Sequence, residues 1–193
     1  SSELPPEKTD EQLRVHVIGS SMTFGWGVVE SETYPSRLKE SLSALYPQRK
    51  VLLVNGGIGN TNTELYVEQF KLQYEDTKPD IVIMQYFVND AEVISPKATN
   101  PIYRYLISFA FLKQLLDVAT QQVSGSGSLS DYYGALYEQG ASGWTSVQEY
   151  VRELKELGTK ENFDLVILMI PDLHDLSKAG LFSDMYLRIE SAF

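Results

Sequence analysis

The sequence predicts an α/β fold in which an open, mostly parallel sheet is covered by helices on both faces. Two observations support this prediction: short apolar runs alternate with segments of helical spacing, and turn-forming residues follow three of the apolar runs. A chain of 193 residues, 43% of them hydrophobic, has enough apolar material for one domain with a sizeable core. We therefore expect a single domain over residues 13–193.

The expected elements alternate between strand and helix along the first half of the chain. Strands are expected over residues 13–18, 50–54 and 80–87, and helices over residues 34–45 and 63–74. Residues 91–145 interrupt this order as a helical insertion after the third strand, with a helix over residues 103–120 and a Gly/Ser-rich loop over residues 124–130. The order resumes with a helix over residues 146–157, a strand over residues 163–170 and a last helix from about Leu181.

Both ends of the chain depart from this pattern. Residues 1–12 are polar and contain two prolines, so we interpret them as a linker or disordered segment outside the domain. Residues 184–193 have helical spacing but stop at Phe193 without a capping signal. The strand over residues 163–170 would then be an exposed apolar edge, and we expect that a C-terminal strand is missing from the sheet.

Charge and composition disfavour several classes of partner and site. The 16 basic and 26 acidic residues give a net charge of −10 without a basic stripe, which argues against nucleic acid and anionic lipid surfaces. The most apolar run, residues 101–118, contains three charged residues, so we expect no integral membrane segment. The absence of cysteine excludes disulfides, thiolate catalysis and cysteine-bound zinc. It leaves the compartment open, with an extracytoplasmic one favoured over the cytoplasm.

Three polar loops are expected to meet at the carboxyl ends of the strands, where open parallel sheets bind ligands. The turn over residues 19–25 (GSSMTFG) can present Ser21 as a nucleophile, although a serine after a strand is also a common helix cap. The second loop, residues 55–63, is rich in glycine and asparagine and can direct amide hydrogens into a cleft. The third, residues 87–90, offers Asn89, whose neutral amide suits a developing oxyanion.

Only two histidines are available as a general base. His16 lies between two valines of the first strand, and we expect it to be packed against the sheet. His174 follows the fourth strand and has carboxylates on both sides, at Asp172 and Asp175. That pattern fits a base, but it also fits an exposed histidine near a helix cap. We favour a role for His174 in the substrate cleft over a role as the base.

Taken in order, the blocks over residues 19–25, 55–60 and 88–90 resemble those of the GDSL or SGNH hydrolase family. Order and spacing agree over roughly the whole chain. The resemblance implies a flavodoxin-like three-layer α/β/α sandwich and an esterase-type site without a cofactor or a metal. Carried over by position, it implies Ser21 as the nucleophile and Asn89 as the side-chain oxyanion donor. The backbone donor of the second block is then Gly59 or Asn60.

The chain departs from the family pattern at three places. Ser20 stands where the family usually has an aspartate that braces the nucleophile turn, and its hydroxyl can still accept one amide hydrogen bond. Phe87 replaces the usual glycine of the third block, which we expect to alter the wall of the cleft. The Asp-x-x-His segment that supplies the catalytic acid and base does not occur in the chain, and we expect it beyond Phe193.

These residues predict hydrolysis of a short acyl ester by acyl transfer to Ser21. Asn89, the second block and the Ser21 amide would stabilise the oxyanion. We expect Asn60, Asp90 and His174 on the substrate side of the site. An O-acetyl group on a carbohydrate is a substrate suggested by family analogy alone.

Two other classes of function are alternatives to an esterase. A non-catalytic binding module on the same fold would explain Ser20 and the absent Asp-x-x-His segment. A flavodoxin-type cofactor carrier is weaker, and the fingerprints of dinucleotide, phosphate-loop and α/β-hydrolase sites are absent. The aromatic residues Tyr132, Tyr133, Tyr137 and Trp144 can line a sugar groove or pack the insertion on the domain, and we favour packing.

Overall fold

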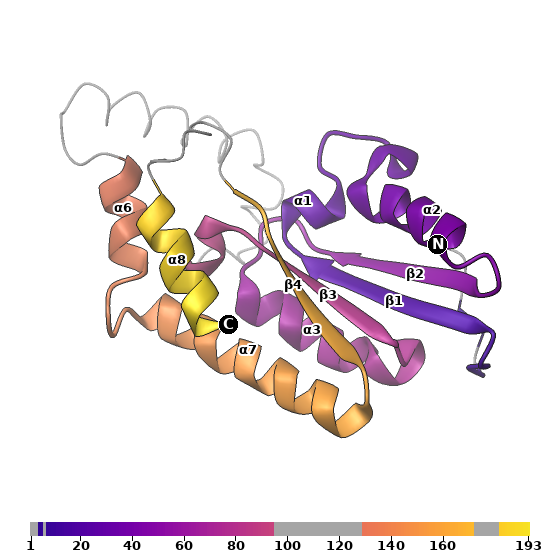
Figure 1. Ribbon diagram of the computed structural model, residues 1–193. Coiled ribbons are helices and arrows are strands. Elements are labelled where there is room, and N and C mark those ends of the chain that lie inside the picture. Colours follow the sequence, from indigo (N-terminus) through magenta and orange to yellow (C-terminus); the bar gives the residue numbers. More distant parts are fainter. Residues whose placement is uncertain (1–3, 6, 95–128, 172–181) are drawn as a thin grey trace, which may run out of the picture.

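The computed structural model describes residues 4–5, 7–94, 129–171 and 182–193. At its centre is a sheet of four parallel strands in the order β2-β1-β3-β4 (Figure 1). The strands are β1 (Gln12–Gly19), β2 (Lys50–Gly57), β3 (Ile81–Tyr86) and β4 (Asp164–Met169). The predicted α/β fold with a parallel sheet is therefore confirmed.

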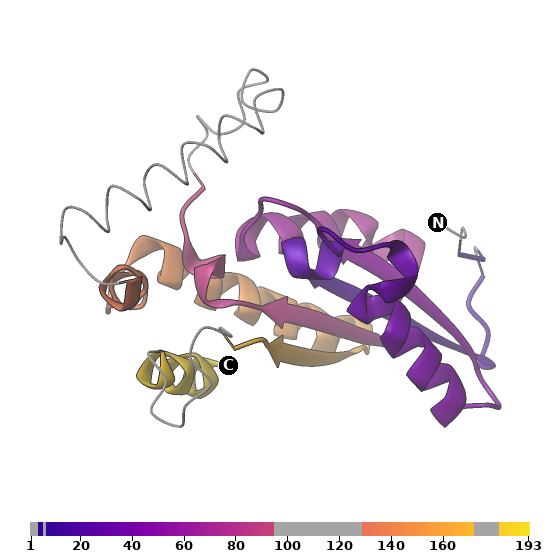
Figure 2. The ribbon, with the colours of Figure 1, turned by 90° about the horizontal axis from the view of Figure 1, so that it is seen from above.

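Helices cover both faces of this sheet. α2 (Tyr34–Leu45) lies on one face, and α3 (Thr63–Thr77) and α7 (Ser142–Glu161) lie on the other (Figure 1, Figure 2). The shorter described elements are α1 (Ser21–Phe24), α6 (Leu129–Leu136), α8 (Ser183–Ala192) and the 3₁₀ turns η1 (Glu30–Glu32) and η2 (Val88–Ala91). Each face of the sheet carries a hydrophobic core, the larger one beneath α3 and α7.

Local capping signals account for the helix starts that agree with the sequence. At the start of α2, Thr33 Oγ1 accepts a hydrogen bond from the Ser36 amide, and Pro35 lies in the first turn. At the start of α3, Asn62 Oδ1 accepts one from the Leu65 amide. Because these signals are carried by neighbouring residues, the start of both helices can be predicted without tertiary information.

β2 is longer than predicted. Residues 55–57 were expected in a loop because asparagine and glycine disfavour strands. In the structure they pair in register with residues 17–19 of β1. Hydrogen bonding to the central strand therefore overrides their low intrinsic propensity, and it carries two glycines up to the start of α1.

The packing interpretation of the aromatic residues is confirmed for Tyr137 and Trp144, which are buried in the larger core. The Tyr137 hydroxyl donates to the Val88 carbonyl oxygen at 2.8 Å and lies 2.7 Å from the Tyr86 hydroxyl. Tyr132 is exposed. The segment between α6 and α7 thus anchors the η2 turn at the carboxyl end of β3.

β4 is an edge strand, as predicted. Among the described residues it pairs with β3 alone. One side of β4 contributes to the larger core, while Val166 and Leu168 on the other side are exposed. The predicted C-terminal strand stays a prediction.

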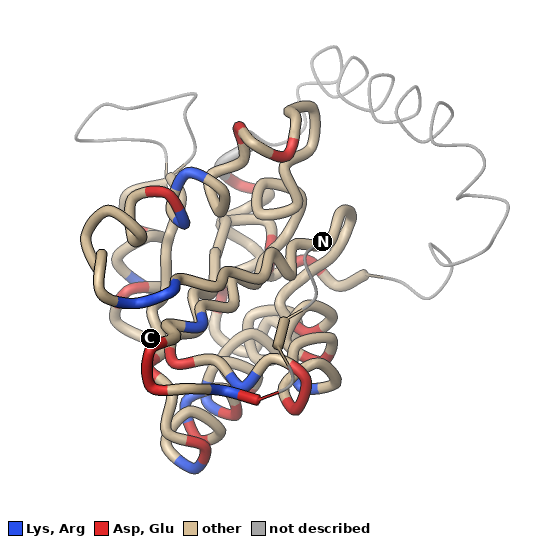
Figure 3. The backbone as a smooth tube through the Cα atoms, turned by 90° about the vertical axis from the view of Figure 1, so that its right-hand side faces the viewer, with Lys and Arg blue, Asp and Glu red and all other residues tan. Residues whose placement is uncertain are grey.

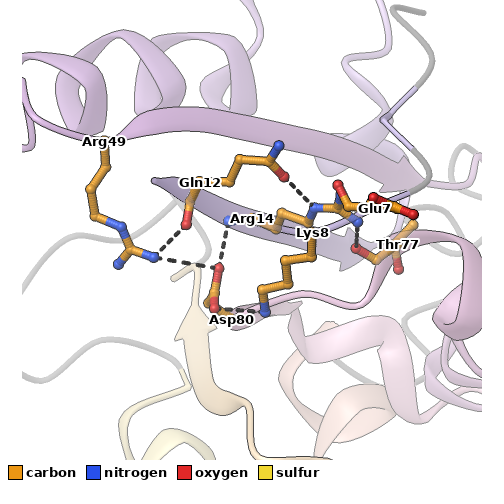
Figure 4. Close-up of polar contacts among 7 residues, drawn as sticks. All are labelled: Glu7, Lys8, Gln12, Arg14, Arg49, Thr77 and Asp80. Carbon is orange, nitrogen blue, oxygen red and sulfur yellow. Dashed lines mark hydrogen bonds and ion pairs between the residues drawn. The ribbon is translucent and has the colours of Figure 1, made fainter. Parts of the chain in front are cut away.

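The segment before β1 is attached to the domain, in contrast to the expected linker. The buried Arg14 guanidinium donates to the Pro5 carbonyl oxygen at 2.7 Å and to the Glu7 carbonyl oxygen at 2.9 Å; Figure 4 shows Arg14 beside Glu7. Lys8 forms an ion pair with Asp80 at 2.7 Å. Gln12, expected in the linker, is the first residue of β1. Arg14 looks like an ordinary polar position of a strand in the sequence, and only the fold shows what it binds.

Basic and acidic residues are intermixed along the described part of the chain. Figure 3 shows Lys and Arg positions lying among Asp and Glu positions. Ion pairs such as Arg37–Glu40 and Lys71–Glu68 are spaced about one helical turn apart and are at least partly exposed to solvent. Pairs of this kind contribute at most about 1 kcal/mol each to stability, so the packed cores carry the fold.

The expected helix over residues 103–120 and most of the Gly/Ser-rich loop lie outside the described residues. The last two residues assigned to that loop begin α6 instead. No helix in the described part of the chain combines the length and apolar character needed to cross a membrane.

Candidate active site

The structure brings the three polar loops together at the carboxyl ends of the strands. The Ile58 amide of the second loop donates to the Gly19 carbonyl oxygen of the first at 3.0 Å. The Asn62 side chain donates to the Glu92 carbonyl oxygen, beyond the third loop, at 3.0 Å. The second loop therefore bridges the other two.

The first loop turns sharply to start α1 at Ser21. Gly19 has φ 156°, and a Cβ at this position would collide with Thr23 Oγ1 and approach Gln85 Oε1 to 2.8 Å. The turn closes with Gly25 in the left-handed conformation, its amide donating to the Ser21 carbonyl oxygen at 3.1 Å. Ser21 is half-buried at the first position of α1, and its hydroxyl makes no hydrogen bond to any described residue.

β2 ends in two glycines, and the second, Gly57, lies against α1. A Cβ at Gly57 would overlap the backbone of Thr23 and Phe24, and one at Gly56 would lie 2.6 Å from His16 Nε2. Close contact between the end of β2 and the backbone of α1 is possible only because residue 57 has no side chain. Gly57 therefore lets α1, which begins at Ser21, pack against the end of β2, which is a different role from shaping a loop.

Ser20 is the N-cap residue of α1, but its hydroxyl accepts no amide hydrogen bond from a described residue, so that expectation was wrong. Its hydroxyl instead donates to Gln85 Oε1 at 3.4 Å. Ser20 is buried beneath the turn. Its side chain consequently faces the end of β3 and not the backbone of its own helix.

Asn89 lies in η2, at the carboxyl end of β3. Its Oδ1 is buried and without a hydrogen-bond partner, and its side chain bonds no other described residue. Because Oδ1 is the enclosed atom, the amide nitrogen is the end available to an acceptor from outside. This leaves a neutral donor beside the strand that carries Ser21, since β1 and β3 are neighbours.

Asp90 is buried and does not reach solvent, which argues against the substrate contact expected for it. Its Oδ2 accepts a hydrogen bond from the Phe87 amide at 2.9 Å and lies 3.5 Å from the Tyr66 hydroxyl. Burial raises the pKa of Asp90 to about 7, although hydrogen bonds from the Phe87 amide and the Tyr66 hydroxyl act in the opposite direction. The hydrogen bond from the Phe87 amide to the buried Asp90 carboxyl therefore closes the η2 turn that carries Asn89.

In the second loop, Asn60 is exposed and has φ 54°, the left-handed conformation that asparagine tolerates better than most residues. Gly59 is half-buried, and a Cβ there would contact the Trp26 ring at 3.7 Å. Gly59 and Asn60 both remain candidates for the backbone oxyanion donor.

Four exposed apolar side chains follow Ser21 closely in the chain, and sequence reasoning missed this set, which we call the apolar wall. The wall consists of Phe24, Trp26, Val28 and Val29, whose exposed fractions are 52%, 67%, 51% and 62%. The rings of Phe24 and Trp26 are tilted, with centroids 6.3 Å apart. Large apolar side chains this exposed and this close in sequence mark a binding surface more often than isolated ones do. Their clustering directly after the nucleophile is the signal that was available.

Gln85 was also missed. It is fully buried in β3, and its side chain reaches the turn that carries Ser21. The available signal was a glutamine inside the apolar run of residues 81–87, because a buried polar residue needs a hydrogen-bonding reason to be there.

His16 is packed in the sheet, as predicted, and does not reach the candidate site. Its Nδ1 lies 3.2 Å from Thr77 Oγ1, its Nε2 is buried without a partner, and its ring packs edge-on against Phe70. Burial lowers the pKa of His16 to about 4, so the ring is neutral. His174, Asp172 and Asp175 lie outside the described residues, so their expected roles stay predictions.

A cavity of about 870 Å³ lies at the opposite end of the sheet, at the amino ends of the strands. Leu13, Arg49, Asp80 and Asp164 are among its lining residues. It is separated from Ser21 by the length of β1, so it is not part of the candidate site. No cluster of three potential metal ligands occurs among the described residues.

No protein-family model matches the sequence, and no curated protein matches it. Among solved structures, the chain is similar to AlinE4, an SGNH-hydrolase family esterase, with 17% identity over 96% of this chain and 99% of that chain and a TM-score of 0.42. It is similar to TesA, with 16% identity over 92% and 96% and a TM-score of 0.41. It is also similar to the acetyl xylan esterase AlAXEase, with 17% identity over 81% and 77% and a TM-score of 0.33. AlinE4 belongs to the family whose sequence blocks this chain resembles.

Proposed function

We propose that this protein is a serine esterase of the SGNH type that cleaves short acyl esters through an acyl-enzyme on Ser21. One observation carries the proposal: the central strand β1 ends in the turn that presents Ser21, and the neighbouring strand β3 ends in the turn that presents Asn89. A nucleophile and a neutral hydrogen-bond donor are thus held by adjacent strands of one rigid sheet. That is the arrangement acyl transfer needs.

In the proposed reaction, Ser21 Oγ attacks the ester carbonyl carbon while a histidine takes the hydroxyl proton. The tetrahedral oxyanion accepts hydrogen bonds from Asn89 Nδ2, from the Ser21 amide and from the amide of Gly59 or Asn60. Collapse of the intermediate expels the alcohol, which receives its proton from the histidine, and water then releases the acid. The buried, neutral His16 does not supply this base, so the proposal assigns it to a histidine outside the described residues.

The apolar wall supports an acyl group as the recognised part of the substrate. Phe24 and Trp26 follow Ser21 by three and five positions, and Trp26 borders the second loop at Gly59. A short hydrocarbon chain placed there would cover exposed ring surface and gain about 25 cal/mol per Å² of apolar area buried. A carbohydrate as the alcohol part of the ester remains a proposal by family analogy.

Labelling with a fluorophosphonate tests the nucleophile, because the reagent modifies only an activated serine. Intact mass spectrometry of the parent should show a single adduct, and Ser21→Ala should abolish it. Ser43→Ala, at an exposed serine on α2, is the matched control and should label like the parent. An adduct that persists in Ser21→Ala, or an unlabelled parent that includes the Asp-x-x-His segment expected beyond Phe193, would contradict the proposal.

A binding module is the second candidate, because the described part of the site holds no histidine. In that case the parent would resist labelling yet still bind a short-chain ester or its acid in calorimetric titration. Ser21→Ala would then leave the affinity unchanged within about twofold. Labelling at Ser21 would exclude this candidate.

A further inference from the structure

We propose that Gln85 is the positioning residue for the nucleophile: its side-chain oxygen holds the turn on both sides of Ser21. The inference rests on the esterase function proposed above. Gln85 does not touch substrate in this assignment, because it is fully buried beneath the turn. It acts through Ser20 and Thr23.

Three donors from the turn converge on Gln85 Oε1. The Ser20 amide donates at 3.3 Å, the Ser20 hydroxyl at 3.4 Å and the Thr23 hydroxyl at 3.0 Å. Ser20 and Thr23 are both buried. Ser21 lies between these two anchored residues, so one oxygen on β3 restrains the backbone from which the nucleophile projects.

The orientation of the Gln85 amide follows from its surroundings. The Ser20 backbone N–H can only donate, so the atom that faces it must be the oxygen. Gln85 Nε2 then points away from the turn and is buried without a hydrogen-bond partner among the described residues. Leaving an amide nitrogen unpaired in the interior lowers stability. Packing alone would favour an apolar side chain here, so the glutamine is better explained by what its oxygen holds.

Gly19 allows the hydrogen bonds to Gln85 Oε1 to form. A Cβ on Gly19 would lie 2.8 Å from Gln85 Oε1 and 2.9 Å from Gln85 Cβ. The end of β1 can therefore approach β3 closely enough for these hydrogen bonds only because residue 19 lacks a side chain. The Thr23 hydroxyl, whose proton goes to Gln85, also lies 2.8 Å from Tyr34 OH, which ties the turn to α2.

The hydrogen bonds from Ser20 and Thr23 to Gln85 Oε1, which we call the brace, also connect the turn that carries Ser21 to the strand that leads to Asn89. Gln85 lies next to the last residue of β3, and the η2 turn that carries Asn89 follows that strand directly, closed by the hydrogen bond from the Phe87 amide to Asp90 Oδ2. Displacement of Gln85 would thus shift the nucleophile relative to the oxyanion donor. A misplacement of about 1 Å between reacting groups can cost about a hundredfold in rate.

The test compares Gln85→Met, which keeps size and removes the acceptor, with Gln85→Glu, which keeps an acceptor oxygen in either protonation state. With p-nitrophenyl acetate, Gln85→Met should lower kcat at least about tenfold and leave KM within about twofold. Gln85→Glu should recover most of the lost kcat. Thr23→Val removes one of the three donors without changing shape, and it should lower kcat severalfold if Gln85→Met does not fold.

Thr77→Val is the control for destabilisation, because it removes a buried hydroxyl near His16 at the far end of α3. It should unfold at lower urea concentration than the parent but retain kcat. If Gln85→Met and Thr77→Val lose stability alike and both keep parental kcat, the positioning role is overturned.

A second readout separates failure of this inference from failure of the esterase proposal. Amide hydrogen exchange read by mass spectrometry should be faster in Gln85→Met over residues 19–25 and unchanged over α7. An inactive parent would overturn the esterase, and faster exchange confined to residues 19–25 would still support the brace. Unchanged exchange there would overturn the brace whatever the activity.

Discussion

At the scale of single residues, the candidate site separates into groups that face outward and groups that hold them. The Ser21 hydroxyl and the Asn89 amide nitrogen make no hydrogen bonds to described residues. Ser20, Gln85 and Asp90 are buried behind them and bonded to one another or to backbone amides. Sequence reasoning found the first group and misjudged the second, because a motif records residue types and not the directions of side chains.

Asn89→Ala tests the outward group. The variant should fold normally, since the side chain bonds no other described residue. The esterase rate should fall about a hundredfold, the usual effect of losing one oxyanion donor. Steady-state kinetics together with thermal unfolding would check this. A parental rate in a folded variant would remove Asn89 from the oxyanion hole.

At the scale of elements, the ends of the strands decide what the loops can do. The sequence predicts a loop over residues 55–57. In the structure they pair with β1, and Gly57 packs against the backbone of α1. The starts of α2 and α3 could be predicted because their caps lie within a few residues of the helix. The extension of β2 could not, because it depends on a partner strand far away in the chain.

Gly57→Ala tests this contact between a strand and a helix. A methyl group at this position would overlap the backbone of Thr23 and Phe24, so α1 must move. We expect a loss of about 1–3 kcal/mol in the free energy of unfolding, together with weakened labelling of Ser21. Gly134→Ala, where a Cβ has open space within α6, is the matched control. It should be neutral or more stable by up to about 1 kcal/mol. Equal effects of the two substitutions in urea unfolding would contradict the assigned contact.

At the scale of the whole molecule, two buried titratable groups make stability depend on pH in opposite senses. Burial raises the pKa of Asp90 to about 7, so the folded state holds its proton more tightly than the unfolded state does. Its contribution to the free energy of unfolding therefore falls as pH rises from about 4 through about 7. Burial lowers the pKa of His16 to about 4, so its contribution falls as pH drops from about 6.5 toward 4.

Asp90→Asn separates these two contributions. Because a neutral amide cannot titrate, the variant should lose the decline in stability between pH 5 and pH 8 that the buried carboxyl causes in the parent. Below pH 6 the contribution of His16 should remain. Urea unfolding at several pH values would measure both. Identical pH profiles for the parent and Asp90→Asn would show that Asp90 does not carry the raised pKa.

The sequence by itself determined the α/β class, the order of strands and helices, and the choice of Ser21 and Asn89 as candidates, because hydrophobic periodicity, helix caps and loop motifs are written in neighbouring residues. Only the tertiary structure decided that Gln85 reaches Ser20 and Thr23, more than sixty residues away in the chain. It also decided that Asp90 points inward and that Arg14 binds the segment before β1. These features depend on which strands become neighbours and which face of each is buried, and long-range packing sets both.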